Sequence, residues 1–241
     1  MDPFSILARA QWLTSPESLR APAGIRWAFA GKSGLSAEPH HLRQVHGVAL
    51  IAASNITTPG ATDAIRPEGD GLFSTRPGTI VGVKTADCLP VLFGAEEGVI
   101  AVHAGWRGLQ QGILLRTIAE LKRLRADLAA VEVALGPSIL PSQFEIGPEV
   151  LQAFSKSPHS LSPAAFAHCF MKGHDDRWHM DLQSFALQQL VSQGIVPERI
   201  QVIRSCTFTE KNLWFSFRRE KQRTGSNWSW VVREAFSTTS R

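Results

Sequence analysis

Three short apolar runs, separated by turn residues, constrain the fold of this chain more than any other feature. They read "TIVGVKT", "LPVLFG" and "GVIAVHAG", and they follow one another within residues 79–105. Each run is short and rich in Val or Leu, and Gly, Asp or Pro stands at its boundaries, which favours strands over helices. Because continuous apolar runs are typical of strands buried on both faces, other elements must cover this sheet.

Further strands are predicted by short β-branched or alternating stretches along the chain. We expect them within residues 25–34, 41–54, 130–136 and 198–206, and in a strand-rich end that includes residues 213–219 and 227–236. Residues 56–69 are rich in Pro, Gly, Thr and Asp, which indicates a loop. Residues 162–178 show neither a clear helix pattern nor a clear strand pattern.

Helices are predicted where apolar residues recur at spacings of three and four. The first begins at Gly108 and carries an apolar stripe: Leu109, Ile113, Leu114, Ile118, Leu121 and Leu124. A second starts near Pro148, a residue favoured at the first helical position. A third covers residues 181–194, with Asp181 as its N-cap and Gly194 as its stop.

The length and the order of these elements predict one domain. A chain of 241 residues is long enough for one large domain or two small ones. No linker divides it, so we expect a single mixed α/β (α+β) domain over residues 1–241, with helices covering the sheets.

Charge and hydropathy narrow the classes of partner. The net charge of +4 comes from scattered Lys and Arg residues, without the dense basic patch typical of nucleic-acid readers. The start of the chain lacks a basic segment followed by a clean apolar one, and no apolar stretch approaches the ~18 residues of a membrane span. We therefore expect a cytoplasmic protein that acts on a small molecule and binds neither nucleic acid nor membrane.

Three candidate metal ligands stand at the ends of predicted strands. They are His46 in "RQVHG", Cys88 in "TADCLP" and His103 in "VHAGWRG". Taken singly, each has a structural interpretation, because lone histidines are often surface residues and lone cysteines often fill cores. Taken together, each follows a predicted strand and precedes a chain break, at Gly47, Pro90 and Gly105.

Two imidazoles and one thiolate form a donor set that suits zinc. Three protein ligands leave the fourth tetrahedral position for water or substrate, which is typical of catalytic zinc sites. Tetrahedral bonds require the two nitrogens and the sulfur to lie within about 4 Å of one another. Copper also accepts His and Cys and stays an alternative.

The other two cysteines, Cys169 and Cys206, lie outside these motifs. Three cysteines are an odd count, which argues against a disulfide framework. We expect both residues to be non-catalytic.

Four blocks in a fixed order resemble the signature of a known family. "QVHG", "DGLFSTRPGTIVGVKTADCLPVLF", "AVHAGWRG" and "GPSILPSQFEIGPEV" span roughly Gln44 to Val150. They are similar to blocks of the YfiH/YlmD family, once called laccase-domain or polyphenol oxidase proteins and now described as purine nucleoside phosphorylases. A looser similarity continues through "WHMDLQSFALQQL" and "SCTFTEKNLWFSFRRE".

The resemblance implies a fold, a site and an activity. The fold would be two mixed β-sheets packed together with outer helices, a cysteine-hydrolase-like YfiH architecture. His46, Cys88 and His103 fall on the motif positions that form the family's catalytic metal site. The implied activity is zinc-dependent phosphorolysis of adenosine and inosine, with adenosine deamination as a further activity, so purine nucleoside and phosphate are the implied partners. In this reading Gly105 and Gly108 let the backbone turn sharply, and Trp106 forms a wall of the pocket.

The chain also departs from the family pattern. The N-terminal block is shorter, with Lys32 and Ser36 standing in for parts of it. Ser138 replaces a cysteine, Ala186 an asparagine and Ser226 an arginine. These changes spare the metal motif but affect the expected substrate range and anion contacts.

Candidate residues around the metal have weaker sequence support. We expect Arg107, Lys32 and Arg218 to contact substrate or phosphate; Arg107 lies near a helix start, where backbone N–H groups favour anions. A structural salt bridge is the alternative for Arg107, and a solvated strand face for Arg218 and Arg219. Asp87 could orient a ligand or cap a turn. Asp70 is a further acidic residue near the ligands, and Glu145 a structural carboxylate near the pocket.

Three rival functions stay open at the level of sequence. In a Cys–His hydrolase that edits peptidoglycan precursors, Cys88 would be the nucleophile and His103 the base. A copper polyphenol oxidase is disfavoured because one three-ligand site cannot easily reduce oxygen by four electrons. A non-catalytic metal- or protein-binding module would show no turnover with any nucleoside.

Overall fold

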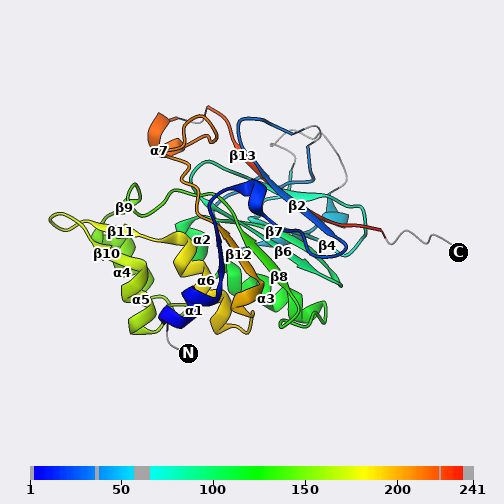
Figure 1. Cartoon of the computed structure of the whole chain (residues 1–241), viewed down its shortest axis with the longest axis horizontal. Helices are drawn as coiled ribbons and strands as arrows, with labels where there is room; N and C mark the ends of the chain where they lie inside the picture. Colours follow the sequence, from blue (N-terminus) through cyan, green and yellow to red (C-terminus); the bar gives the residue numbers. More distant parts are fainter. Residues whose placement is uncertain (1–2, 36–37, 57–65, 223, 236–241) are drawn as a thin grey trace, which may run out of the picture.

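A seven-stranded mixed sheet forms the centre of the computed structural model, which describes residues 3–35, 38–56, 66–222 and 224–235 (Figure 1). The sheet is ordered β1 (Gln11–Leu13), β12 (Ile200–Ile203), β8 (Glu132–Leu135), β6 (Leu89–Ala95), β7 (Gly98–Ala104), β4 (Gly71–Ser74) and β3 (Leu50–Ala52). Strands from both ends of the chain interleave in this sheet, and the single domain over residues 1–241 stays a prediction.

The hairpin of β6 and β7 lies in the middle of this sheet. The two strands pair antiparallel from Leu89↔Ala104 to Ala95↔Gly98, and every residue in them is buried. Burial on both faces explains why these segments are almost continuously apolar. The polar exception is His103, which is paired with Pro90 near the end of the hairpin.

Different layers cover the two faces of the large sheet. Antiparallel strands β2 (Ile25–Ala30), β13 (Asn227–Arg233) and β5 (Val81–Thr85) form a second sheet. Its side chains, such as Trp27 and Val83, share a core with Leu92 and Ala101 of the large sheet. Helices pack on the opposite face, where Ile113, Ile118 and Phe185 join the other core. In Figure 1, β2 and β13 of the second sheet lie above the large sheet and helices α1 to α6 lie below it, whereas α7 lies at the top left.

The helices follow the predicted apolar patterns for the most part. They are α1 (Pro3–Arg9), α2 (Trp106–Gln110), α3 (Ile113–Arg123), α4 (Pro148–Ser155), α5 (Pro163–Cys169), α6 (Leu182–Ser192) and α7 (Phe217–Glu220), with short 3₁₀ turns at Pro16–Ser18, Ala53–Asn55 and Pro197–Arg199. Asp181 caps α6 as expected, since its side chain accepts from the Ser184 N–H at 3.0 Å. Gly194 follows α6 with a left-handed φ of 105°.

The mixed α/β class and the packing of two sheets with outer helices are confirmed. A third, small antiparallel sheet adds β9 (Glu145–Ile146), β10 (Phe170–Lys172) and β11 (Trp178–Met180). It resolves the ambiguous segment 162–178 into a helix followed by a hairpin.

Three local expectations were wrong. The helix expected from Gly108 begins at Trp106 and is interrupted at Gly112, whose left-handed φ of 86° starts α3. The strand expected within 41–54 is reduced to Leu50–Ala52. The strand expected at 213–219 is instead a loop leading into α7, because Ser216 accepts from the Arg219 N–H and starts a helix.

Parts of two expectations lie outside the described residues. The structure does not describe residues 57–65, which make up most of the predicted loop 56–69, nor does it describe Ser36. Across the part of the chain that is described, every helix is too short or too polar to traverse a lipid bilayer.

Candidate metal centre

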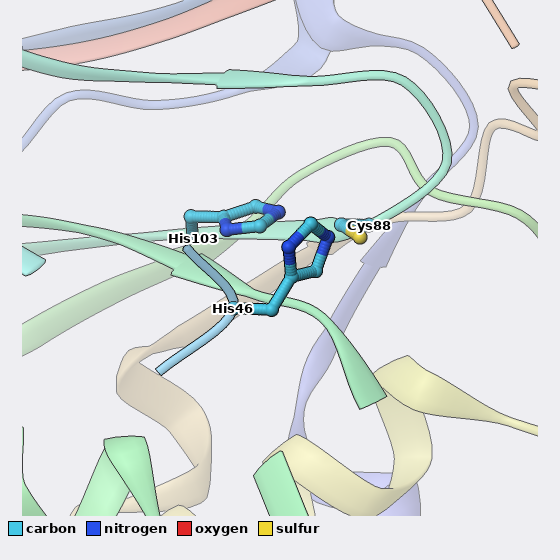
Figure 2. Close-up of side chains that lie close together, drawn as sticks. All are labelled: His46, Cys88 and His103. Carbon is cyan, nitrogen blue, oxygen red and sulfur yellow. The ribbon is translucent and has the colours of Figure 1, made fainter. Parts of the chain in front are cut away.

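His46, Cys88 and His103 converge in the structure from three separate segments. One ligand atom from each, an imidazole nitrogen or the thiol sulfur, lies within 4.8 Å of the others. Figure 2 shows the three side chains turned toward one another. The two imidazole rings meet edge to face, with centroids 4.8 Å apart. Among the described residues this is the one group of three such side chains that could hold a metal ion.

His103 is the buried member of the group. It lies on β7 and is 3% exposed. Its Nδ1 lies 2.7 Å from Oδ1 of Asp70. A carboxylate only accepts hydrogen bonds, so Nδ1 carries the proton and donates it, which leaves Nε2 for a ligand. The tautomer that a metal site needs is therefore set by Asp70.

Asp70 also holds the turn that carries His46. Its carboxylate accepts from the backbone N–H groups of Val45 at 3.2 Å, His46 at 2.9 Å and Gly47 at 2.7 Å. His46 has a left-handed φ of 61°, which is uncommon for a residue with a side chain. Since these N–H groups bond to a carboxylate, they do not enter a β-ladder, and the predicted strand does not form here. His46 is the exposed member of the group.

Cys88 lies between β5 and β6 and is partly buried. Burial raises the pKa of its thiol, but the charge of His103 and hydrogen bonds with His103 and His46 outweigh burial and lower the pKa to about 6. Burial lowers the pKa of His103, whereas Cys88 and Asp70 raise it to about 9. In the protein without metal, a thiolate therefore faces an imidazolium at neutral pH.

Gly105 lies close to two of the candidate ligands, Cys88 and His46. A Cβ atom on this residue would lie 3.0 Å from Sγ of Cys88 and 3.1 Å from Cδ2 of His46. Its φ of −68° is accessible to any residue, so the glycine is required for space and not for a sharp turn. Gly108 likewise lies inside α2, where a Cβ would approach the Gly47 carbonyl oxygen at 3.1 Å. The expectation that both glycines serve backbone turning was wrong.

The donor set fits a metal ion with a small adjustment. A tetrahedral ion with bonds of about 2.0–2.3 Å needs ligand atoms about 3.5 Å apart, whereas the largest separation here is 4.8 Å. The expected spacing of about 4 Å is slightly exceeded, so the ligand side chains must move closer together when an ion binds. Two features favour a bound cation: the buried Asp70 carboxylate that holds His103, and the lowered pKa of the Cys88 thiol.

The predicted anion-binding residues occupy different surroundings. Arg107 lies in the first turn of α2, exposed, with its guanidinium 4.4 Å from the centroid of the Trp106 ring. Trp106 itself packs partly buried against the core. Among described residues no carboxylate pairs with Arg107, so a phosphate contact stays a prediction.

Lys32 and Arg218 have partners within the protein. The Lys32 ammonium donates to the Lys211 carbonyl at 2.7 Å and lines a cavity of about 400 Å³ to which none of the three candidate ligands contributes. The Arg218 guanidinium lies 5.5 Å from the Phe144 ring centroid and reaches the Glu145 carbonyl at 3.3 Å. Phosphate binding by either residue stays a prediction.

The remaining candidates are structural in their contacts. The Arg219 guanidinium donates to the carbonyls of Thr207, Phe208 and Trp214. The Glu145 side chain is exposed and lies 3.8 Å from Arg177. Cys169 is fully buried, and burial raises the pKa of its thiol well above the usual range.

Two of the departures from the family pattern are buried. Ser138 and Ala186 are fully buried, in the loop after β8 and in α6. Cys206 lies beside Ser138 in an isolated parallel bridge and is buried as well. Ser226 is half-buried just before β13.

Sequence reasoning missed the functions of Asp70 and Gly105. The motif that contains Asp70 is "GDG", in which an acidic residue stands between two small ones just before a buried strand. That pattern signals a buried carboxylate in a tight turn, but not which N–H groups it meets.

Comparison with known proteins gives one consistent family. Residues 24–234 match the family described as multi-copper polyphenol oxidoreductase laccase. The purine nucleoside phosphorylase YfiH of Shigella flexneri is 38% identical over 202 residues, which cover 82% of this chain and 76% of that protein. The adenosine deaminase RL5 of an unknown prokaryotic organism is 32% identical over 167 residues, 68% of this chain and 62% of that protein.

A solved structure shares the fold. The crystal structure of YlmD from Geobacillus stearothermophilus superposes with a TM-score of 0.72 at 27% identity, covering 80% of this chain and 73% of that chain.

Proposed function

The chain belongs to the YfiH family of multi-copper polyphenol oxidoreductase laccases, and from that premise we propose that it is a zinc-dependent purine nucleoside phosphorylase. The family relatives are enzymes by name, which supports an enzymatic role for this chain. Adenosine and inosine are the proposed substrates, and adenosine deamination is the proposed second activity.

The convergence of His46, Cys88 and His103 carries this proposal. A zinc ion held by these three side chains would supply a Lewis acid with one further position for phosphate or water. His46 is exposed while His103 is buried, so the group opens to solvent on the His46 side. A small molecule in solution therefore has access to the open position.

The proposed reaction places defined demands on the chain. In phosphorolysis a phosphate oxygen bonds to C1′ of the nucleoside, the C1′–N9 bond breaks, and the purine leaves with the electron pair and takes up a proton. The products are the free base and ribose 1-phosphate. Arg107, exposed and without a carboxylate partner among the described residues, is our candidate for holding the phosphate.

Other parts of the proposal are less specific. We propose one catalytic domain over residues 1–241, a cytoplasmic location, and small-molecule partners without nucleic acid or membrane binding. Copper is the alternative metal. A single group of three ligands in the described part of the chain gives little support to oxidase chemistry with several copper ions.

A Cys–His hydrolase is the second candidate, favoured by one observation. The thiol of Cys88 has its pKa lowered to about 6 beside an imidazole held by a carboxylate, as in enzymes that use a thiolate nucleophile. His46 has no evident task in such a dyad, whereas it completes a metal site. This difference makes the metal-dependent phosphorylase our first choice.

Metal analysis followed by product analysis tests the proposal. The purified protein should contain zinc, and it should convert inosine to hypoxanthine and ribose 1-phosphate only when phosphate is present. Chelation should abolish this turnover, and added zinc should restore it. Full phosphorolysis by metal-free protein would exclude the proposed zinc dependence, and a covalent substrate adduct on Cys88 in metal-free protein would favour the hydrolase. Metal binding without turnover of any nucleoside would favour a non-catalytic module.

A further inference from the structure

Asp87, the residue directly before Cys88, has an unusual backbone. Its backbone φ is 101°, a value that residues with a side chain rarely adopt. Such conformations persist only where the surrounding contacts fix them, and they concentrate at functional sites. The contacts of Asp87 therefore determine how the next residue, Cys88, is presented.

The carboxylate of Asp87 is buried and fully engaged. Its Oδ1 accepts from the hydroxyl of Thr207 at 2.6 Å, and its Oδ2 accepts from the backbone N–H of Arg218 at 2.7 Å. The carbonyl oxygen of Asp87 accepts from the N–H of Ile139 at 2.9 Å. Three segments distant in sequence thus meet at the residue that precedes the thiol.

These segments are themselves tied to one another. The Thr207 N–H donates to the Ser138 carbonyl at 3.1 Å. The guanidinium of Arg219 donates to the Thr207 carbonyl at 2.7 Å. The partners of Asp87 thus belong to one hydrogen-bonded unit. This unit holds Asp87 in place, and with it the backbone that leads into Cys88.

Helix α7 has a cap of its own besides Asp87. The hydroxyl of Ser216 accepts from the Arg219 N–H at 3.2 Å and caps the helix. If Asp87 only satisfied a helix end, this second cap would make it partly redundant. Its position beside Cys88, with the strained φ, points to a different role.

We propose that Asp87 is a positioning residue: it holds the Cys88 sulfur where it can bind a metal ion together with His46 and His103. This inference rests on the proposed metal-dependent function. The two buried aspartates then divide the task, because Asp70 holds both histidines and Asp87 holds the cysteine. Neither carboxylate belongs to the group of candidate ligands.

Cobalt(II) titration of the whole protein tests the proposal, because a cobalt–thiolate bond has its own near-ultraviolet absorption band. Asp87→Gly keeps the backbone conformation accessible and removes only the carboxylate. We expect cobalt to bind at least about tenfold more weakly to this variant, with a weaker thiolate band. Asp87→Asn, which keeps the size and one oxygen acceptor, should recover part of both.

A matched control separates backbone strain from the carboxylate. Asp175 also has a positive φ, 51°, but is exposed in the hairpin between β10 and β11. Asp175→Gly should leave cobalt affinity and the band unchanged. If Asp87→Gly does not fold, Thr207→Val removes one donor to Asp87 with nearly the same shape and should also weaken both signals.

The outcomes separate this inference from the function on which it rests. Wild-type affinity and an unchanged band in Asp87→Gly, or in Thr207→Val where the glycine variant does not fold, would overturn the positioning role and leave the metal-dependent function standing. Failure of the wild-type protein to bind cobalt or zinc would overturn both. A loss of unfolding stability with a normal thiolate band would show that Asp87 is structural only.

Discussion

The carboxylate of Asp70 lies 2.7 Å from Nδ1 of His103 and 2.9 Å from the backbone nitrogen of His46. One fully buried side chain therefore sets the tautomer of one candidate ligand and the backbone of another. Burial raises the pKa of Asp70, but its hydrogen bond and charge interaction with His103 and the N–H groups of the His46 turn lower it overall. The surroundings of Asp70 thus favour its ionised form.

Replacing Asp70 should weaken metal binding strongly. In Asp70→Asn the charge is lost and the amide satisfies fewer of these donors, so zinc affinity should fall about 10- to 100-fold, as for other outer carboxylate partners of metal-bound histidines. Competition with a chromophoric chelator measures the dissociation constant. Asp127→Asn is the control, because Asp127 is exposed and, among the described residues, its carboxylate accepts only from the nearby Ala129 N–H. Equal zinc affinity in the two variants would contradict this role.

Gly105 should tolerate no side chain while metal is bound. In Gly105→Ala the new Cβ would press on Cys88 and His46 at about 3 Å, so zinc affinity and turnover should fall at least about tenfold. The backbone conformation suits alanine, so the free energy of unfolding without metal should change little. Gly47→Ala, whose Cβ would make ordinary contacts of 3.5 and 3.6 Å, is the neighbouring control. A metal affinity equal to wild type in Gly105→Ala would show that the space is not needed.

These two residues show where sequence reasoning stops. The three candidate ligands could be predicted because each stands at a motif boundary beside a turn residue. The tasks of Asp70 and Gly105 could not, because they depend on segments that meet only after folding. A carboxylate that accepts from three successive N–H groups leaves no periodicity in the sequence.

The fold shows the same division. Helix α6 and its cap at Asp181 were predicted correctly, because propensity, capping and tertiary packing agree there. The segment 213–219 was expected to be a strand because it is one of the short stretches in the strand-rich end of the chain. Its local contacts decide otherwise, since the buried Trp214 donates its indole N–H to Ser205 at 2.7 Å and the Phe215 N–H donates to the Asn227 side chain.

Ser138 should be replaceable without loss of stability. Its hydroxyl is buried and has no hydrogen-bond partner among the described residues. Ser138→Ala removes an unsatisfied polar group, so the free energy of unfolding should stay equal or rise by about 1 kcal/mol. Ser205→Ala is the matched control: this buried hydroxyl donates to Glu210 and accepts from Trp214, so its loss should cost about 1–3 kcal/mol. Urea unfolding measures both, and a large loss in Ser138→Ala would reveal a missed partner.

His41 should make stability depend on pH. Burial, together with the charges of Lys84 and Arg66, lowers the pKa of His41, and a hydrogen bond to the Pro39 carbonyl and the charge of Glu38 oppose this only in part. The unfolded chain then binds the proton more readily than the folded one. The stability contributed by neutral His41 is present above about pH 6.5, the unfolded value, and is lost as pH falls toward the folded pKa.

The variant His41→Gln tests that dependence. Its side chain does not titrate, so the fall in unfolding free energy between pH 7 and pH 5 should be smaller than in wild type. Urea unfolding gives the unfolding free energy of each protein at both pH values. Comparing the change with pH in the variant with that in wild type removes the pH-independent cost of the substitution. An identical pH dependence in both proteins would show that His41 is not the group responsible.

Cys88→Ser distinguishes a metal ligand from a nucleophile. A neutral hydroxyl is a much weaker zinc ligand than a thiolate, so metal content and phosphorolysis should fall together. Chelation of the wild type should produce the same loss, and added zinc should reverse it there but not in the variant. Cys169→Ser and Cys206→Ser are the matched controls, because both cysteines lie outside the group of candidate ligands, and activity should stay within a few fold. If Cys88 is instead a nucleophile, activity survives chelation and a covalent adduct forms on its sulfur. The exposed His46 argues for the first outcome, since a Cys–His dyad leaves it without a task.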